Sequence, residues 1–247
     1  VRKIAVIGNR AESVLKDWYG ALPAYSVSAL EGIKAAVEGE DVEVRFQAWD
    51  SDGKAQELAA WADVAIVCVG NHPMTSPDWK WEKIQAPWGE GTVAGDGREA
   101  VDRRSLELES EDLIKMVWKA NPNTIVALIS SFPYTIDWTQ EHVPSILHVS
   151  QCSQKLGNAL ADVRFGDYNP AGRTTQTWVK DILDLPGMLH YDIRNGRTYM
   201  YFKGEPLYPF GYGLSYTSFE YSRLKVRCQE DSVRLSFDLS NTGGRDG

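Results

Sequence analysis

Five short apolar segments rich in β-branched residues recur between Ile4 and Val149, and they constrain the fold more than any other feature. Segments this short and this apolar are typical of parallel strands buried on both faces of a sheet. Helical patterns separate them, and strand–helix alternation predicts an α/β domain with a mostly parallel sheet sandwiched by helices. The expected strands are Ile4–Ile7, Val42–Phe46, Val64–Val69, Ile125–Ile129 and Ile146–Val149.

Four segments with helical patterns lie between or after these strands. The clearest one, 110–120, begins with Ser110 as a potential N-cap, followed by two acidic residues in the first turn. In open parallel sheets, ligands bind beyond the carboxyl ends of the strands. The loops after Val69 and Ile129 are therefore the places to search for a site. The other expected helices are 29–37, 55–62 and 155–165.

The C-terminal part of the chain has a different pattern, in which apolar and polar residues alternate. Such alternation predicts half-exposed antiparallel strands at Tyr221–Arg227 and Ser232–Leu239. We therefore divide the chain into an α/β domain at residues 1–216 and a short β-rich segment at residues 217–247.

An aromatic run connects these two parts. From Tyr191 to Phe219 it contains six Tyr, three Phe, two Pro and four Gly. Pro206 and Pro209 interrupt any helical period. The run predicts a structured loop that packs aromatic rings across a surface or a domain junction, with ligand contact as the alternative.

Composition excludes several classes of function. The net charge of −8 argues against a nucleic-acid or anionic-membrane surface, and no apolar run approaches the ~20 residues of a membrane span. Cys68, Cys152 and Cys228 lack disulfide or metal-ligand spacing, so we expect free, mostly buried thiols, no metal site and no cofactor. The chain opens directly on a strand at Val1, so we expect a truncated N-terminus, and the cellular compartment stays undetermined.

Three separate motifs resemble one family. NGRTYMYF followed by PLYPFGYGLSYTSFEYS, then FGDYNPAGRTTQTW, and KDWYGALPAYSVSALEGI are similar to the C-terminal α/β sandwich domain of glycoside hydrolase family 3, the β-glucosidase and β-xylosidase group. The resemblance implies that 217–247 is the truncated start of a fibronectin type III-like domain. It also implies a retaining, exo-acting β-glycosidase, with β-glucosidase as the first expectation. The alternatives are a β-xylosidase, a non-catalytic carbohydrate-binding or scaffold relative, and an unrelated flavodoxin-type binding domain.

The long connection from Asn71 to Leu108 carries the candidate catalytic residues. Loops of this length are usually functional or disordered, and its three Trp argue against disorder. Within it, REAVDR resembles the family's E-G-x-D-R segment, which implies that Glu99 is the general acid/base. Glu90 is the alternative. The same match implies that Asp102 and Arg103 form a structural ion pair at the base of the loop.

The same connection holds the candidate substrate-binding residues. Trp79 and Trp88 offer aromatic faces on which sugar rings stack and which desolvate a neighbouring carboxyl group. Asn71 and His72 directly follow the expected strand 64–69, where either side chain can contact a sugar hydroxyl or cap the turn. We expect no nucleophilic serine at Ser130 or Ser131, because neither a G-x-S-x-G elbow nor a histidine at usable spacing accompanies them.

The resemblance also implies that part of the enzyme lies outside this chain. The family's nucleophile is an Asp on an N-terminal (β/α) barrel, and no segment here resembles that barrel. We therefore expect a second domain that supplies the acid/base to a β-linked oligosaccharide or glycoside and packs against the barrel. Since glycoside hydrolysis with retention needs two carboxyl groups, this chain alone should be inactive.

Overall fold

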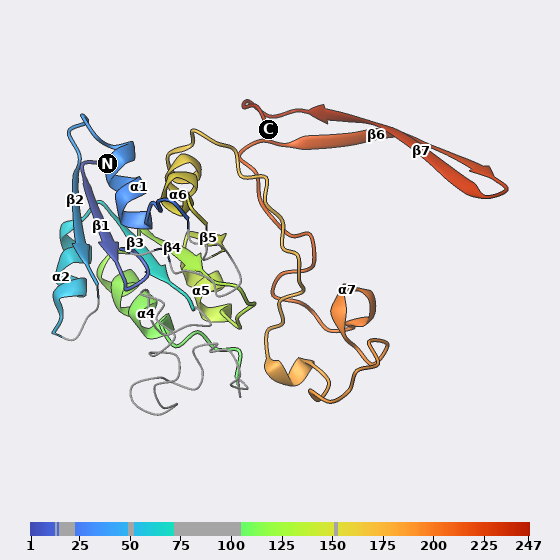
Figure 1. Cartoon of the computed structure of the whole chain (residues 1–247), viewed down its shortest axis with the longest axis horizontal. Helices are drawn as coiled ribbons and strands as arrows, with labels where there is room; N and C mark the ends of the chain where they lie inside the picture. Colours follow the sequence, from blue (N-terminus) through green and yellow to red (C-terminus); the bar gives the residue numbers. More distant parts are fainter. Residues whose placement is uncertain (13, 15–22, 49–51, 72–104, 151–152) are drawn as a thin grey trace.

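A five-stranded parallel sheet forms the centre of the chain (Figure 1). The strands are β1 (Lys3–Ile7), β2 (Glu43–Gln47), β3 (Val64–Val69), β4 (Thr124–Ile129) and β5 (Ser145–Val149), in the spatial order β2-β1-β3-β4-β5. The predicted strands agree with them to within one residue at each end. The computed structural model describes residues 1–12, 14, 23–48, 52–71, 105–150 and 153–247.

Helices cover both faces of the sheet, as the alternation predicted. On one face lie α1 (Ala29–Ala36) and α6 (Leu156–Phe165), and on the other lie α2 (Lys54–Trp61) and α4 (Glu111–Ala120). Successive residues of a strand point to opposite faces, so each strand contributes to both cores. The expected α/β sandwich is therefore confirmed.

Helices α1 and α6 approach each other unusually closely. A Cβ atom added to Gly157 on α6 would lie 1.9 Å from the carbonyl oxygen of Ser28, and one added to Gly32 on α1 would lie 2.1 Å from the Gly157 backbone. Ser28 also begins α1 with a capping box, in which it exchanges hydrogen bonds with Glu31. The two glycines thus allow the helices to pack backbone against backbone.

Among the helices of the sandwich, the structure departs from the sequence prediction at α4 and at the segment after β4. Ser110 does precede α4, but its side chain makes no hydrogen bond to the helix amides. Instead, Glu111 Oε1 accepts hydrogen bonds from the backbone nitrogen and the hydroxyl of Thr139, at 3.3 and 2.8 Å. Thr139 belongs to α5 (Asp137–His142), a six-residue helix that was not predicted. The first-turn carboxylate of Glu111 therefore holds α5 beside α4, and α4 begins without a side-chain cap.

An extended arm at residues 166–218 leaves the α/β sandwich after α6 (Figure 1). Its outgoing and returning segments pair through Trp178 and Tyr208 and through two 2.8 Å hydrogen bonds between Thr174 and the backbone of Tyr212 and Gly211. The turn of this arm, residues 181–205, is named here the distal lobe. It holds η1 (Ile182–Asp184) and α7 (Thr198–Tyr201).

The aromatic run lies on this arm, and its rings do pack in part. Tyr208 stacks on Tyr212 with ring centroids 5.0 Å apart, and Tyr199 stacks on Phe210 at 4.5 Å. Tyr191, however, is 83% exposed. The predicted packing of aromatic rings is therefore present on the returning segment of the arm and absent over much of the distal lobe.

A two-stranded ribbon follows the arm and projects away from the sandwich (Figure 1). Strands β6 (Phe219–Gln229) and β7 (Ser232–Asn241) pair antiparallel, as predicted. Facing pairs share one side of a ribbon, and here Tyr221 with Leu239 and Val226 with Leu235 form an apolar side. The opposite side is polar.

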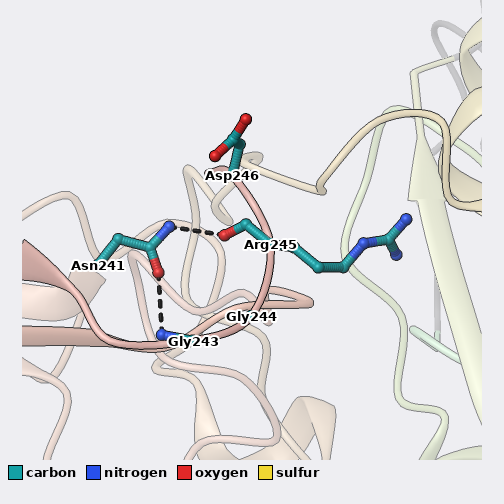
Figure 2. A pocket seen from close by; sticks show the side chains of 5 residues that line it. All are labelled: Asn241, Gly243, Gly244, Arg245 and Asp246. Carbon is teal, nitrogen blue, oxygen red and sulfur yellow. Dashed lines mark hydrogen bonds between the residues drawn. The ribbon is translucent and has the colours of Figure 1, made fainter.

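A glycine-rich turn attaches this ribbon to the sandwich. A pocket of about 610 Å³ lies there. Figure 2 shows the residues that line it, Asn241, Gly243, Gly244, Arg245 and Asp246. The Asn241 amide donates to the carbonyl of Arg245 and accepts from the nitrogen of Gly243. The Arg245 side chain leaves the pocket and donates to the carbonyl of Gly166 at 2.6 Å, so it ties the ribbon to the end of α6.

In the described part of the chain, no helix is long and apolar enough to cross a bilayer. The same residues contain no group of three His, Cys, Asp or Glu side chains placed as metal ligands are. Cys68 and Cys228 are free thiols. Burial raises the pKa of Cys68 to about 12, whereas Cys228 is exposed on the ribbon, against the expectation of mostly buried thiols. Cys152 lies outside the described residues.

Candidate active-site edge

The carboxyl edge of the sheet brings together three chain segments that are distant in sequence. Asn71 follows β3, and Ser130 follows β4. Since Val69 pairs with Leu128 in the parallel register, Asn71 and Ser130 lie level on neighbouring chains. Arg10, which follows β1, donates from Nε to the carbonyl of Gly70 at 3.3 Å. The predicted search position after β3 is thus built from β1, β3 and β4.

Gly70 allows the chain to leave β3 at this edge. Its φ of +134° lies in the region that residues with a Cβ rarely adopt. A Cβ atom there would also lie 2.0 Å from the carbonyl oxygen of Ile129. The direction in which Asn71 departs from the sheet therefore depends on a glycine at this position.

Asn71 itself is an unusual group. It is 0% exposed, and neither its side-chain oxygen nor its side-chain nitrogen has a hydrogen-bond partner among the described residues. Buried amides are nearly always paired, and an unpaired one costs about 1–3 kcal/mol of stability. The alternative that Asn71 caps its own turn has no hydrogen bond to support it. A donor and an acceptor are thus held at the point where the long connection starts.

The other end of the long connection returns to the same edge. Leu106 accepts a 2.9 Å hydrogen bond from the backbone nitrogen of Thr135, and Glu107 forms a parallel bridge with Thr135. Leu108 is buried in the core beside α4. Because Thr135 lies in the loop that follows β4, the chain segments that flank residues 72–104 both join the carboxyl edge of the sheet.

A partly buried polar contact joins this edge to the arm. Ser130 Oγ lies 3.2 Å from His148 Nε2 on β5 and donates to the carbonyl of Phe132 at 3.2 Å. The His148 ring meets the Trp178 ring edge-to-face, with centroids 5.1 Å apart. Part of His148 is exposed. Burial of the rest of the ring lowers its pKa, and a hydrogen bond to the Ser130 backbone offsets this lowering in part.

This contact corrects one sequence prediction. No histidine was expected beside Ser130, yet the pairing of β4 with β5 brings His148 to it across 18 residues of sequence. Ser130 is nevertheless completely buried. Its hydroxyl donates to the carbonyl of Phe132, so its proton is not directed to His148, and the pair has a structural role. The expectation of no nucleophile at Ser130 therefore remains, for a different reason.

Sequence reasoning also missed the way in which the arm is anchored. The Tyr208 hydroxyl donates to Gln140 Oε1 on α5, and its ring meets that of Trp178 at 5.5 Å. Burial raises the pKa of Tyr208. These contacts place the outgoing and the returning segments of the arm beside the candidate edge. The signal in the sequence was the aromatic run itself, which did not reveal its partners.

Most of the predicted site residues lie outside the described part of the chain. Of that set, the structure places Asn71 alone. The predictions for the others stand as they were made. They are His72, Trp79, Trp88, Glu90, Glu99, Asp102 and Arg103.

Comparison with known proteins gives a consistent result. Residues 1–216 match the family described as glycosyl hydrolase family 3 C-terminal domain. A β-glucosidase from Kluyveromyces marxianus is 30% identical over 87% of this chain, which spans 23% of that protein. A xylan 1,4-β-xylosidase from Xylanibacter ruminicola is 35% identical over 84% of this chain, which spans 25% of that protein.

Solved structures agree with these relatives. A β-glucosidase from Erythrobacter marinus superposes with a TM-score of 0.74 at 31% identity, over 100% of this chain and 36% of its own. A β-D-glucoside glucohydrolase from Trichoderma reesei gives 0.79 at 25% identity, over 98% and 39%. The chain thus spans well under half of each relative. It belongs to glycosyl hydrolase family 3, and it corresponds to the C-terminal domain of that family.

Proposed function

We propose that this chain is the second domain of a retaining, exo-acting β-glycosidase that hydrolyses terminal β-linked sugars. β-Glucosidase is the first expectation. One observation in the structure carries the proposal: the chain on both sides of residues 72–104 joins the carboxyl edge of a parallel sheet. Sheets of this kind bind their ligands at that edge. The relatives named β-glucosidase support the choice of reaction.

The proposed chemistry divides two carboxyl groups between two domains. Glu99, on the segment that leaves this edge, protonates the leaving oxygen and then activates water. An Asp of the preceding (β/α) barrel domain attacks the anomeric carbon and forms a glycosyl-enzyme. Asp102 and Arg103 hold the base of the connection. No cofactor takes part, because proton transfer and carboxylate attack complete the reaction.

Four residues are proposed to contact the sugar. Trp79 and Trp88 supply aromatic faces, and Asn71 and His72 supply hydrogen bonds. The unpaired donor and acceptor of Asn71 support its inclusion, since a group that has no partner in the described residues is available to a hydroxyl. As Asn71 is completely buried here, its contact with a sugar requires the groups that cover its side chain to move.

A further part of the proposal concerns residues 217–247. We propose that they begin a fibronectin type III-like domain, whose remaining strands would cover the apolar side of the β6–β7 ribbon. The support is the regular exposure of that side: Val233, Leu235, Phe237 and Leu239 are each 51–62% exposed. Two-stranded ribbons are marginally stable alone and need a packed face.

A second candidate substrate class is favoured by a specific observation. Enzymes named for β-xyloside hydrolysis are among the relatives, including a β-xylosidase from Formosa agariphila that aligns with 98% of this chain. Turnover of aryl β-glucosides against aryl β-xylosides by the full-length protein distinguishes the two. Turnover of neither would favour the non-catalytic scaffold alternative.

The decisive experiment replaces Glu99 in the full-length protein. Glu99→Ala should slow hydrolysis of substrates with poor leaving groups by ~10²–10⁴-fold. The loss should be much smaller for activated aryl glycosides, because their leaving groups need little protonation. Azide should restore turnover and give a β-glycosyl azide, since the glycosyl-enzyme still forms and a small anion attacks it without a base.

Glu90→Ala is the matched control in the same protein. It should retain wild-type kinetics and show no response to azide. If Glu90→Ala shows the azide rescue and Glu99→Ala does not, the acid/base role moves to Glu90. The chain described here should show no turnover by itself, and activity that a substitution within it abolishes would contradict the two-domain proposal.

A further inference from the structure

The distal lobe at residues 181–205 exposes several large apolar side chains. Its most exposed members are Leu183, Leu189 and Tyr191, at 85%, 81% and 83%. Three more side chains, Met188, Tyr199 and Met200, are 58–61% exposed. Apolar side chains scattered singly over a surface are normal, whereas a concentration of exposed ones in one small region marks an interaction site.

This exposure does not come from a loosely arranged chain. The Arg197 guanidinium donates from Nε to the carbonyl of His190 at 2.6 Å and from Nη2 to that of Gly187 at 2.7 Å. The same Nη2 reaches the carbonyls of Pro186 and Met188, each at 3.3 Å. One cation thus gathers the backbone of residues 186–190. The backbone turns inward on Arg197 and leaves the side chains of Met188 and Leu189 in solvent.

Two further local contacts hold the lobe in shape. Arg194 makes a bidentate pair with Asp192, with contacts of 2.8–3.2 Å. Asp181 and Asp184 form a reciprocal capping box around η1. A surface whose backbone is already arranged loses little conformational entropy when a partner covers it. The lobe therefore has the properties of a pre-organised binding surface.

The charge of the lobe indicates the kind of partner. Its four acidic and three Lys or Arg side chains nearly balance, and Arg194 is paired within it. Nucleic acids and anionic lipid surfaces are bound by an excess of positive charge, which this lobe does not have. An apolar, nearly neutral surface with several Tyr and Met fits another protein surface.

The comparisons indicate where that protein surface lies. The lobe falls inside residues 1–216, the part that matches the family, so it belongs to the domain and not to the ribbon. The solved relatives nevertheless extend well beyond the matched region, because this chain covers only 36% and 39% of their lengths. A domain of the same polypeptide is present at high effective concentration and reaches such a surface before any separate protein does.

We propose that the distal lobe is the docking surface for the domain that precedes this one in the full-length protein. The proposal rests on the function proposed above, in which that domain carries the nucleophile. Docking through the lobe would fix the two domains relative to each other. The arm that carries the lobe contacts the candidate edge through Trp178 and Tyr208, so docking would also set the position of that edge.

Hydroxyl-radical footprinting of the full-length protein and of this chain alone tests the proposal, because it reports side-chain exposure directly. Rates are normalised to an added reporter peptide. Met188, Tyr191 and Met200 should be oxidised at least ~5-fold more slowly in the full-length protein, since a docked side chain is shielded as in an ordinary protein interface. Equal rates in the two proteins would overturn the proposal.

A matched pair of variants separates docking from a general change in the protein. Leu189→Ser with Tyr191→Ser in the full-length protein should return Met188 and Met200 to the rates of the isolated chain. Leu224→Ser with Tyr221→Ser on the ribbon, at 65% and 69% exposure, replaces the same residue types and should leave the lobe shielded. Loss of shielding in the ribbon variant, and not in the lobe variant, would contradict the proposal.

Two other outcomes are distinguished by the same measurements. Shielding that increases with protein concentration, with a matching rise in mass by light scattering, would assign the lobe to a second copy and overturn the proposal. Shielding needs no turnover, so it is independent of the catalytic assignment. If the lobe is shielded and Glu99→Ala remains fully active, the docking surface stands and the catalytic proposal fails.

Discussion

The sheet of the sandwich and the β6–β7 ribbon use similar apolar residues with opposite results. All six residues of β3 and all six of β4 are buried. In β7, nine of ten residues are exposed, among them Leu235 and Phe237. The difference shows that strand chemistry alone does not produce a core. Burial requires helices on both faces, and only the sandwich has them.

The distal lobe resembles the ribbon in exposure but differs from it in structure. Hydrogen bonds from Arg197 to the backbone fix the lobe locally, whereas the ribbon is held mainly by its own strand pairing and by Arg245 at its base. Two segments with exposed apolar side chains therefore extend from the sandwich, and each is held in shape in a different way. If the sandwich is independent of both, substitutions in its core should change its stability and matched substitutions outside it should not.

Matched leucine truncations should show the largest difference between the regions. Leu128→Ala removes a 0% exposed side chain of β4 from the core beside α4, and it should lower the free energy of unfolding by about 2–5 kcal/mol. Leu239→Ala on the ribbon, where the side chain is 54% exposed, should change it by less than about 0.5 kcal/mol. Urea unfolding followed by circular dichroism measures both, and equal effects would refute the contrast.

Substitution of the closest helix contact should come next. Gly157→Ala places a methyl group 1.9 Å from the Ser28 carbonyl, so α1 and α6 must separate, at a cost of about 1–3 kcal/mol. Gly172→Ala on the arm meets no atom within 4 Å and should be nearly neutral. The same urea titrations apply. A neutral Gly157→Ala would show that the two helices can move apart freely.

Asn71 gives a prediction of opposite sign. Asn71→Leu replaces an unpaired buried amide by an apolar group of similar size, so this chain should gain up to about 1 kcal/mol in its free energy of unfolding. In the full-length protein the same change should raise KM if the amide contacts the sugar. Thermal unfolding of this chain checks the first part. A loss of stability would mean that the amide has a partner that it needs.

The smallest expected effect is a dependence of stability on pH. Burial lowers the pKa of His148 below its ordinary value of 6.5, and a hydrogen bond to the Ser130 backbone opposes this only in part. The native state therefore favours neutral imidazole, so its contribution is complete above about pH 6.5 and is lost as the pH falls through the lower folded pKa. Because part of His148 is exposed, solvent screening should keep the effect below about 1 kcal/mol.

His148→Gln is the control for this pH dependence. It keeps a polar side chain beside Ser130 but cannot take up the proton. Unfolding midpoints at pH 7.5 and 5.0 should therefore differ less in the variant than in the wild type. An unchanged difference would assign the pH dependence to other groups.

Local sequence patterns were enough for most of the secondary structure. Continuous apolar runs and helical periods located the five parallel strands and four helices to within one residue, because both signals arise from neighbours along the chain. The short helix α5, DWTQEH, was missed since six mostly polar residues carry no period. The Ser110 prediction was half right: Ser110 is the N-cap residue of α4, but its side chain makes no hydrogen bond to the helix amides. The first-turn carboxylate of Glu111 bonds to Thr139 on α5, a contact that the local pattern could not indicate.

The candidate site could be predicted only in part. Its position after β3 follows from the rule for parallel sheets, and Glu99 came from resemblance to a family motif. The meeting of Ser130 with His148, and of His148 with Trp178, could not be predicted, because each depends on which strands and segments become neighbours. No periodic pattern encodes the order β2-β1-β3-β4-β5.

By itself, then, the sequence determined the α/β class, the strand and helix positions, the change to antiparallel strands after residue 216, and the family. Tertiary structure alone decided which side chains meet at the carboxyl edge and which apolar side chains remain uncovered. The physical reason is the range of each interaction. Periodicity reports which face of a local element is apolar, whereas burial depends on whether another element, distant in sequence, is placed against that face.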